Sequence, residues 1–259
     1  MLFTLLSVLC ICLLASTAGA ICGIGGGVII KPALDAMQIM TVQQVSFLSG
    51  CTVLCMSLYS VLCSVCRGKQ AFETATILPL GAGAALGGLA GKLLFQRISR
   101  GSRAAALAQA ACLLFLLLGT LVYTLLEKRI RTRRVKSRFA GALIGLFLGF
   151  FSSFLGIGGG PFNLVVLSYF FSMDTKTAAQ HSLCIILISQ AASLLYSFSS
   201  GSVPSVSALM LLVMVAGGVG GGVLGRQINR RLSGAAVHRL FVALTFVIIG
   251  VCVYNMLRA

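Results

Sequence analysis

Long uncharged stretches dominate the pattern of polar and apolar positions along this chain. A helix that crosses a membrane needs about 20 consecutive, mostly apolar residues. One window, 177–225, is long enough for two crossings and is interrupted near its middle by Ser199–Pro204, a segment rich in turn-forming residues. With that division we predict about eight transmembrane helices. Asp, Glu, Lys and Arg are absent from the windows 1–30, 36–66, 74–91, 104–126, 139–173, 177–225 and 240–257.

Composition supports a membrane protein. Only 9% of the 259 residues are charged and the mean hydropathy is +1.05, whereas a soluble domain carries about 25% charged residues. So few charges cannot cover a surface that faces water, so lipid must be the solvent for most of the chain. We therefore predict an all-α, multi-pass integral membrane protein, with the plasma membrane as its expected location.

The formal net charge of +16 does not indicate nucleic-acid binding, because Lys and Arg lie between the apolar windows, where basic residues flank membrane helices. Seven of them fall in Glu127–Arg138. We interpret this segment as a solvated linker, and contact with anionic lipid headgroups is the alternative. On alternate loops of an eight-helix arrangement the 20 basic residues divide ten and ten, so no orientation follows.

The chain contains an internal repeat. Gly23–Gly27 reads GIGGG and recurs as Gly156–Gly160, an offset of 133 that also pairs Leu34 with Leu167 and Ser49 with Ser182. The offset drifts by only a few residues along a whole half of the chain. We therefore predict two homologous four-helix repeats, residues 1–126 and 139–259, joined by the linker 127–138. The first apolar segment belongs to the first repeat, so we expect it to be a mature helix and no cleaved signal.

The triple glycines are the main candidate site. Such a run breaks a membrane helix, and the freed backbone groups must then face protein or a water-filled cavity. Broken helices in corresponding positions of two repeats point to a transporter's midplane site, where helix N-termini favour anions. The alternative is close helix packing, the role that we assign to Gly87, Gly91, Gly221 and Gly225. The predicted substrate-binding glycines are Gly25, Gly26, Gly27, Gly158, Gly159 and Gly160.

Polar residues beside the glycines complete the candidate site. Ser49, Asn163, His181 and Ser182 can all donate hydrogen bonds to an anion without burying a permanent charge. Each can equally serve as a hydrogen bond between helices, and that alternative stays open. Three cations near the predicted helix ends add positive potential, although we expect each to extend its charged group towards the membrane surface. These cations are Lys31, Lys92 and Arg226.

Enzymatic and metal chemistry find little support. The four acidic residues map to predicted helix ends or loops, which disfavours a proton relay, a cation carrier and an enzyme that needs paired carboxylates. Most of the ten cysteines lie in apolar windows, where a thiol behaves as a small hydrophobe. Cys63 and Cys66 form a C-x-x-C motif whose redox or metal role stays open. We expect no catalytic residue, no metal and no cofactor.

Three segments carry a resemblance to a known family. GIGGGVIIKPAL at 23–34, GIGGGPFNLVVL at 156–167 and Gln180–Leu183 resemble the sulfite exporter TauE/SafE family, and the duplicated plan extends this likeness over nearly the whole chain. The resemblance implies a secondary transporter of small sulfur-containing anions such as sulfite, sulfonates or sulfoacetate, working by alternating access between the repeats. It also implies that the glycine runs and Ser182 line the path. A membrane scaffold that carries nothing is the alternative.

Overall fold

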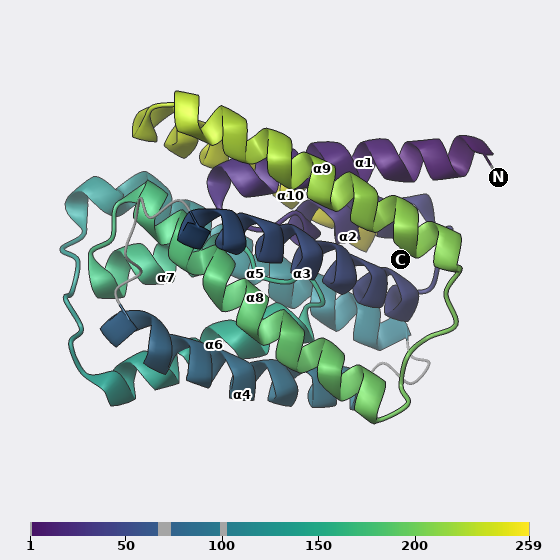
Figure 1. Ribbon diagram of the computed structural model, residues 1–259, viewed down its shortest axis with the longest axis horizontal. Coiled ribbons are helices and arrows are strands. Elements are labelled where there is room, and N and C mark those ends of the chain that lie inside the picture. Colours follow the sequence, from purple (N-terminus) through teal and green to yellow (C-terminus); the bar gives the residue numbers. More distant parts are fainter. Residues whose placement is uncertain (1, 67–73, 99–102, 259) are drawn as a thin grey trace.

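The computed structural model describes residues 2–66, 74–98 and 103–258. These residues form ten α-helices and one short 3-10 helix, Glu127–Arg129, and no strand (Figure 1). The α-helices are α1 (Leu2–Cys22), α2 (Gly27–Met37), α3 (Val42–Cys66), α4 (Thr74–Ile98), α5 (Arg103–Leu126), α6 (Arg138–Phe154), α7 (Pro161–Phe171), α8 (Thr175–Ser199), α9 (Ala208–Arg231) and α10 (Gly234–Arg258).

Seven of these helices are long and apolar enough to cross a membrane. The other three are shorter: α6 has 17 residues, and α2 and α7 have 11 each. The all-helical, multi-pass membrane architecture is thus confirmed. The eight predicted spans do not match the helices one for one. The window 1–30 contains α1 and the beginning of α2, and the window 139–173 contains nearly all of α6 and the whole of α7.

Hydrogen bonds show which helix ends lie together. At one end of the molecule, Gln44 at the start of α3 donates to the carbonyl of Ser205 (2.7 Å), and Gln96 near the end of α4 donates to Ser202 (2.5 Å). Both chain termini also lie at this end, which we call the terminal end (Figure 1). At the opposite end, the linker end, Lys176 at the start of α8 donates to the carbonyl of Leu232 after α9 (2.7 Å).

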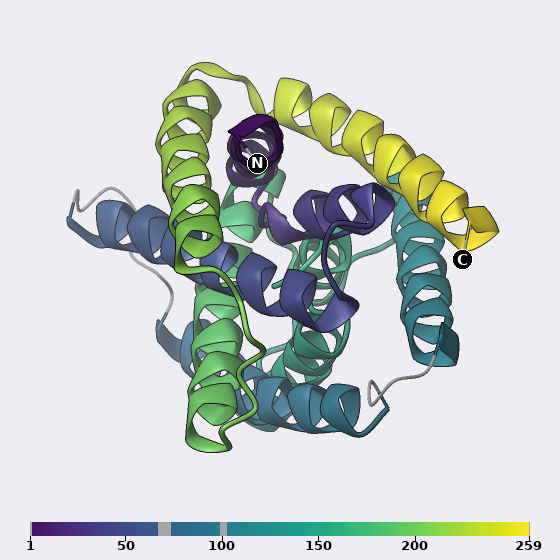
Figure 2. The same cartoon turned by 90° about the vertical axis from the view of Figure 1, so that its right-hand side faces the viewer.

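The short helices α2 and α7 each run back towards the end of the molecule at which the preceding helix, α1 or α6, starts. Helix α1 starts at the terminal end, and α2 returns there to lead into α3 (Figures 1 and 2). Helix α6 starts at the linker end, and α7 returns there, where the backbone N–H of Arg133 in the linker donates to the carbonyl of Tyr169 (2.7 Å). The chain therefore forms two helical hairpins, α1–α2 and α6–α7, that enter from opposite ends and have their tips in the interior.

Glycines allow two helix pairs to pack in close contact. A methyl group at Gly87 or Gly91 of α4 would lie 2.0 Å or 2.2 Å from a carbonyl oxygen of α6, those of Leu146 and Phe150. A methyl group at Gly221 or Gly225 of α9 would likewise lie 2.4 Å from a carbonyl oxygen of α1. Such separations exclude any side chain, so the packing role predicted for Gly87, Gly91, Gly221 and Gly225 is confirmed.

Candidate functional site

The tips of the two hairpins meet in the middle of the molecule. A methyl group at Gly27, the first residue of α2, would lie 2.1 Å from the carbonyl oxygen of Ile157, and one at Gly25 would lie 3.7 Å from that of Gly158. Gly25, Gly158 and Gly159 have positive φ angles of 73°, 70° and 119°, a conformation that L side chains adopt only with strain. The repeated glycines thus permit two backbones to touch and to turn at that point.

The two remaining predicted glycines lie at the helix starts. Gly26 precedes α2, and a methyl group there would lie 2.7 Å from the hydroxyl oxygen of Ser16. Gly160 precedes α7 in extended conformation, with φ of −166°, and a methyl group would meet the ring of Phe162 at 3.0 Å. Protein atoms surround both positions, so the local structure gives each glycine a packing role. Their contact with a substrate stays a prediction.

Three of the predicted polar residues are completely buried. Asn163 on α7, Ser49 on α3 and Ser182 on α8 have no exposed surface, and their side-chain polar atoms have no hydrogen-bond partner among the described residues. The amide nitrogen of Asn163 would lie 3.2 Å from a methyl group at Gly159, so it directly adjoins the second glycine stretch. A buried unsatisfied amide costs about 1–3 kcal/mol, and such a group in a folded protein calls for a functional explanation.

His181 has a clearer structural role. It lies on α8 with only 6% of its surface exposed, and its Nδ1 is 2.9 Å from the carbonyl oxygen of Thr177 one turn earlier. This contact fixes the ring against its own helix. Its contact with a substrate also stays a prediction.

Lys31 lies in the interior, and the expectation that it extends towards the membrane surface is wrong. Its side chain is 5% exposed, and its ammonium group donates to the carbonyl of Leu155 (2.6 Å) and to Oε1 of Gln109 (3.0 Å). Leu155 is the C-cap of α6, and a cation at a helix C-terminus is favourable. Gln109 in turn donates to the carbonyl of Phe154 (2.5 Å). Lys31 therefore joins the two hairpins across the middle of the molecule.

The other two cations differ from the expectation in the same way. Lys92 is 9% exposed, and its Nζ lies 5.4 Å from the centre of the Phe95 ring. The guanidinium of Arg226 on α9 donates to the carbonyl of Ser60 on α3. Neither group is simply extended towards lipid headgroups. Arg226 is instead held by a neighbouring helix, and Lys92 lies against an aromatic ring of its own helix.

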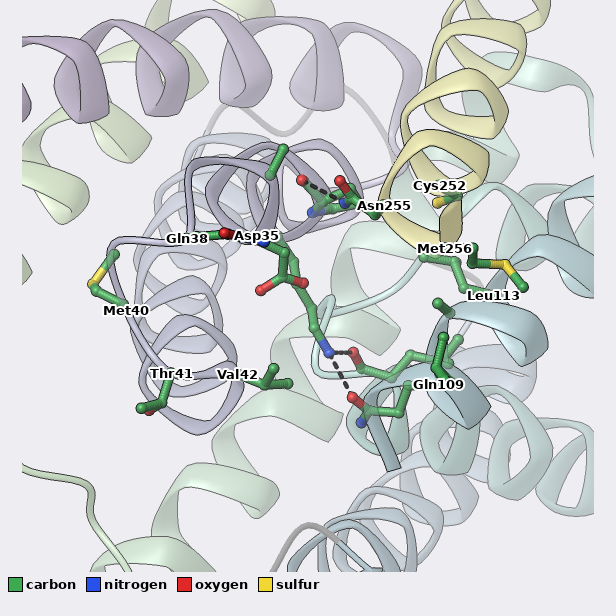
Figure 3. Close-up of a pocket in the computed structure, with 16 residues that line it drawn as sticks. Asp35, Gln38, Met40, Thr41, Val42, Gln109, Leu113, Cys252, Asn255 and Met256 are labelled. Atoms are coloured by element: carbon green, nitrogen blue, oxygen red, sulfur yellow. Dashed lines mark hydrogen bonds between the residues drawn. The ribbon is translucent and has the colours of Figure 1, made fainter. Parts of the chain in front are cut away.

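A cavity of about 330 Å³ lies beside Lys31 on the terminal side of the hairpin tips (Figure 3). Helices α2, α5 and α10 and the start of α3 form its walls. Asp35, one turn after Lys31, also lines the cavity; its Oδ1 is buried without a hydrogen-bond partner, and no ion pair between the two residues occurs in the described structure. The lining residues are Lys31, Pro32, Asp35, Ala36, Gln38, Met40, Thr41, Val42, Leu107, Gln109, Ala110, Leu113, Leu155, Cys252, Asn255 and Met256.

A smaller cavity, of about 80 Å³, lies on the linker side. Three cations and no acidic residue line it, together with Ala20 near the end of α1 and Ala179 of α8. A methyl group at Gly23 would lie 2.2 Å from Cβ of Ala179, so the first glycine stretch adjoins this cavity. The three cations are Lys176, Arg226 and Arg230.

Sequence reasoning missed the polar partners of α2. Gln109 lies inside the uncharged window 104–126 and Asn255 inside 240–257, where Asn255 donates to the carbonyl of Pro32 (2.9 Å). The available signal was the presence of an amide side chain within each predicted membrane helix. Polar groups inside such helices usually face protein or a cavity.

A family comparison identifies the chain. The model of the sulfite exporter TauE/SafE family matches residues 8–252. The chain belongs to this family. Searches of curated proteins and of solved structures find no match. As a member of the TauE/SafE family, the protein is a multi-pass membrane transporter from a family of transporters and not of enzymes, and the resemblance seen in its glycine motifs is confirmed.

Proposed function

We propose that this TauE/SafE protein is a secondary transporter of small sulfur-containing anions, such as sulfite, sulfonates or sulfoacetate. In this proposal, transport proceeds by alternating access between two repeats, residues 1–126 and 139–259. The substrate is a small anion, and the lipid bilayer is the only other partner that we invoke. The family's description as sulfite exporters supports the substrate class.

The observation that carries this proposal is the meeting of two hairpins from opposite ends at tips made of glycine. Broken helices of this kind, in related positions, are typical of transporter sites near the membrane midplane. Cavities lie beside the hairpins at both ends, one of about 330 Å³ on the terminal side and two of about 310 Å³ and 80 Å³ on the linker side.

The order of helix lengths supports the repeat. From α1 to α5 the helices have 21, 11, 25, 25 and 24 residues, and from α6 to α10 they have 17, 11, 25, 24 and 25. The packing is also reciprocal, since α1 lies against α9 and α6 against α4. In this proposal each repeat comprises five helices. These are the four predicted helices and one short helix, α2 or α7, that follows the first of them and runs back.

Transport is tested with purified protein in proteoliposomes loaded with sulfite or methanesulfonate, compared with protein-free liposomes. The informative variant is Gly25→Ala, since a methyl group there meets nothing closer than 3.4 Å and acts only through the positive φ, a strain of about 1–2 kcal/mol. We expect the variant to fold and its flux to fall about tenfold. Gly119→Ala is the control, because no atom lies within 4 Å of that position.

The outcome separates the transporter from the scaffold. Flux that Gly25→Ala reduces and Gly119→Ala leaves unchanged supports a carrier whose hairpin tips must move. Wild-type protein that carries neither anion, although it is folded and correctly inserted, contradicts transport of this substrate class and favours a membrane scaffold whose glycines serve packing.

A further inference from the structure

The smaller cavity, of about 80 Å³ on the linker side, has an excess of positive charge in its lining. Lys176 in the first turn of α8 and Arg226 and Arg230 in the final turns of α9 line it, and no acidic residue of the described structure does. The formal sum of this lining is +3. The acidic residue nearest in sequence, Asp174, caps the start of α8 and accepts from the backbone N–H groups of Lys176 and Thr177.

Backbone carbonyls hold two of these cations in place. The ammonium group of Lys176 donates to the carbonyls of Leu232 (2.7 Å) and Asn229 (3.4 Å), and the guanidinium of Arg226 donates to the carbonyl of Ser60 on α3. An ammonium group has three N–H donors, so Lys176 keeps one for a ligand. Arg230 is exposed and has no hydrogen bond or ion pair with another described residue. The cavity therefore offers positioned donors to an anion.

The position and the size of the cavity favour a lipid ligand. Its walls come from the final turns of α3 and α9, and the same turns carry large apolar side chains that are exposed, Leu62 and Val65 on α3 and Ile228 on α9. Acyl chains cover such surfaces in a membrane. The volume of about 80 Å³ is well below the roughly 300–1,000 Å³ of sites for whole small molecules. Basic pockets between transmembrane helices bind the headgroups of anionic lipids.

From these observations we propose that the smaller cavity binds the phosphate group of an anionic phospholipid, with the phosphate oxygens at Lys176, Arg226 and Arg230. Phosphatidic acid is the simplest such lipid. A phosphomonoester carries a charge of about −1.5 to −2 at neutral pH, which a lining of +3 accommodates. The acyl chains lie outside the cavity, along α3 and α9. This inference goes beyond the proposed transport function, because the lipid is held by the protein and is not carried.

A phosphate at this place connects helices that the chain does not join there. Helices α8 and α9 are linked by residues 200–207 at the terminal end, whereas the cavity lies near their opposite ends. Lys176 belongs to α8 and Arg230 to α9, so one phosphate bound by both holds these ends together. A ligand that binds only the folded protein raises its stability. Thermal melting therefore reports on this site.

The test measures thermal melting of purified, delipidated protein in detergent, titrated with phosphatidic acid, phosphatidylcholine or inorganic phosphate. We expect phosphatidic acid to raise the melting temperature and the other two additives, at equal concentration, to leave it nearly unchanged. Arg230→Gln removes an exposed side chain without internal bonds, so the variant should fold. The phosphatidic acid concentration that gives half of the rise should increase about five- to tenfold in this variant.

Arg231→Gln is the matched control. It removes the same charge from the next position in the last turn of α9, which is also exposed. Arg231 does not line the cavity, so the response of this variant to phosphatidic acid should equal that of the wild type.

Three results would overturn the proposal. Equal losses in Arg230→Gln and Arg231→Gln would show a general attraction to surface charge and no specific site. Wild-type protein that phosphatidic acid stabilises no more than phosphatidylcholine would exclude an anionic headgroup. A rise of the same size with inorganic phosphate would assign the cavity to a soluble oxyanion and not to a lipid. The assay requires no flux, so its outcome is independent of the proposed transport function.

Discussion

Helices α2 and α7 have the same length and the same conformation at their C-caps but very different chemistry. Each has 11 residues, follows a glycine stretch and ends at a residue with φ of 53°, Gln38 after α2 and Ser172 after α7. Helix α2 carries Lys31 and Asp35 and borders the larger cavity. Helix α7 has no charged residue. The comparison teaches that paired hairpins can keep one architecture while only one of them supplies the charges.

The repeat offset of 133 makes this contrast specific. Leu164 and Ser168 of α7 correspond to Lys31 and Asp35 of α2, and Asn163 corresponds to Ile30. Ile30 is completely buried in an apolar cluster, whereas Asn163, equally buried, keeps an unsatisfied amide. The polar residue Asn163 of α7 therefore occupies the position that corresponds to Ile30, one residue before Lys31 of α2. The hairpins are not interchangeable halves of a symmetric site.

The largest expected difference in stability is between variants of two corresponding glycines, Gly27 at the start of α2 and Gly160 just before α7. In Gly27→Ala the new methyl group would lie 2.1 Å from the backbone carbonyl of Ile157, which cannot move away without shifting the other hairpin. We expect destabilisation of about 3 kcal/mol or more, seen as a lower melting temperature and a smaller yield of monodisperse protein.

Gly160→Ala is the matched comparison. Its methyl group would meet only side chains, the ring of Phe162 at 3.0 Å and Cδ1 of Ile157 at 3.4 Å, and its extended φ suits any residue. We expect a loss of about 1 kcal/mol or less. Similar losses in the two variants would show that the hairpin tips do not meet as described.

The next largest effect separates stability from function at Asn163. In Asn163→Leu a similarly shaped apolar side chain replaces an amide without partners, and we expect a gain of about 1–3 kcal/mol in the free energy of unfolding. If Asn163 contacts the anion, as predicted, anion flux should fall in the same variant. Thermal melting and proteoliposome flux measure the two effects. A variant that is less stable would mean that the amide is satisfied in the membrane.

The smallest effect concerns the helix ends. Gln38→Gly relieves a left-handed conformation at an exposed residue, so we expect stabilisation of about 1 kcal/mol. Ser172→Gly relieves the same conformation but loses the hydrogen bond from the Ser172 hydroxyl to Thr132 (2.7 Å), so its net effect should be near zero. Thermal melting of both variants tests this order, and a larger gain at position 172 would contradict it.

Sequence patterns predicted the helical membrane architecture, the glycine motifs and the packing glycines of α4 and α9. They did not predict that α2 and α7 turn back, because an apolar window has the same composition whether its second part continues or reverses. Lys31 was misjudged for a related reason. Its partner carbonyl, that of Leu155, is 124 positions away, and no local pattern encodes such a contact. Gln109 and Asn255 were visible only as isolated amides in apolar windows.

The unequal distribution of basic residues between the two ends of the structure predicts an orientation in the membrane. The linker 127–138, with seven basic residues, lies at one end together with Lys176, Arg230 and Arg231, whereas Arg97, Arg103 and Arg258 mark the described helix ends at the other. Basic loops remain in the cytoplasm, so we expect both termini to face outward. An alkaline phosphatase fused to the C-terminus should be active and a fluorescent protein fused there dark, and the opposite pattern would reverse the topology. In the proposed transport function, the cavity at the terminal end would then exchange its anion with the outer side of the membrane.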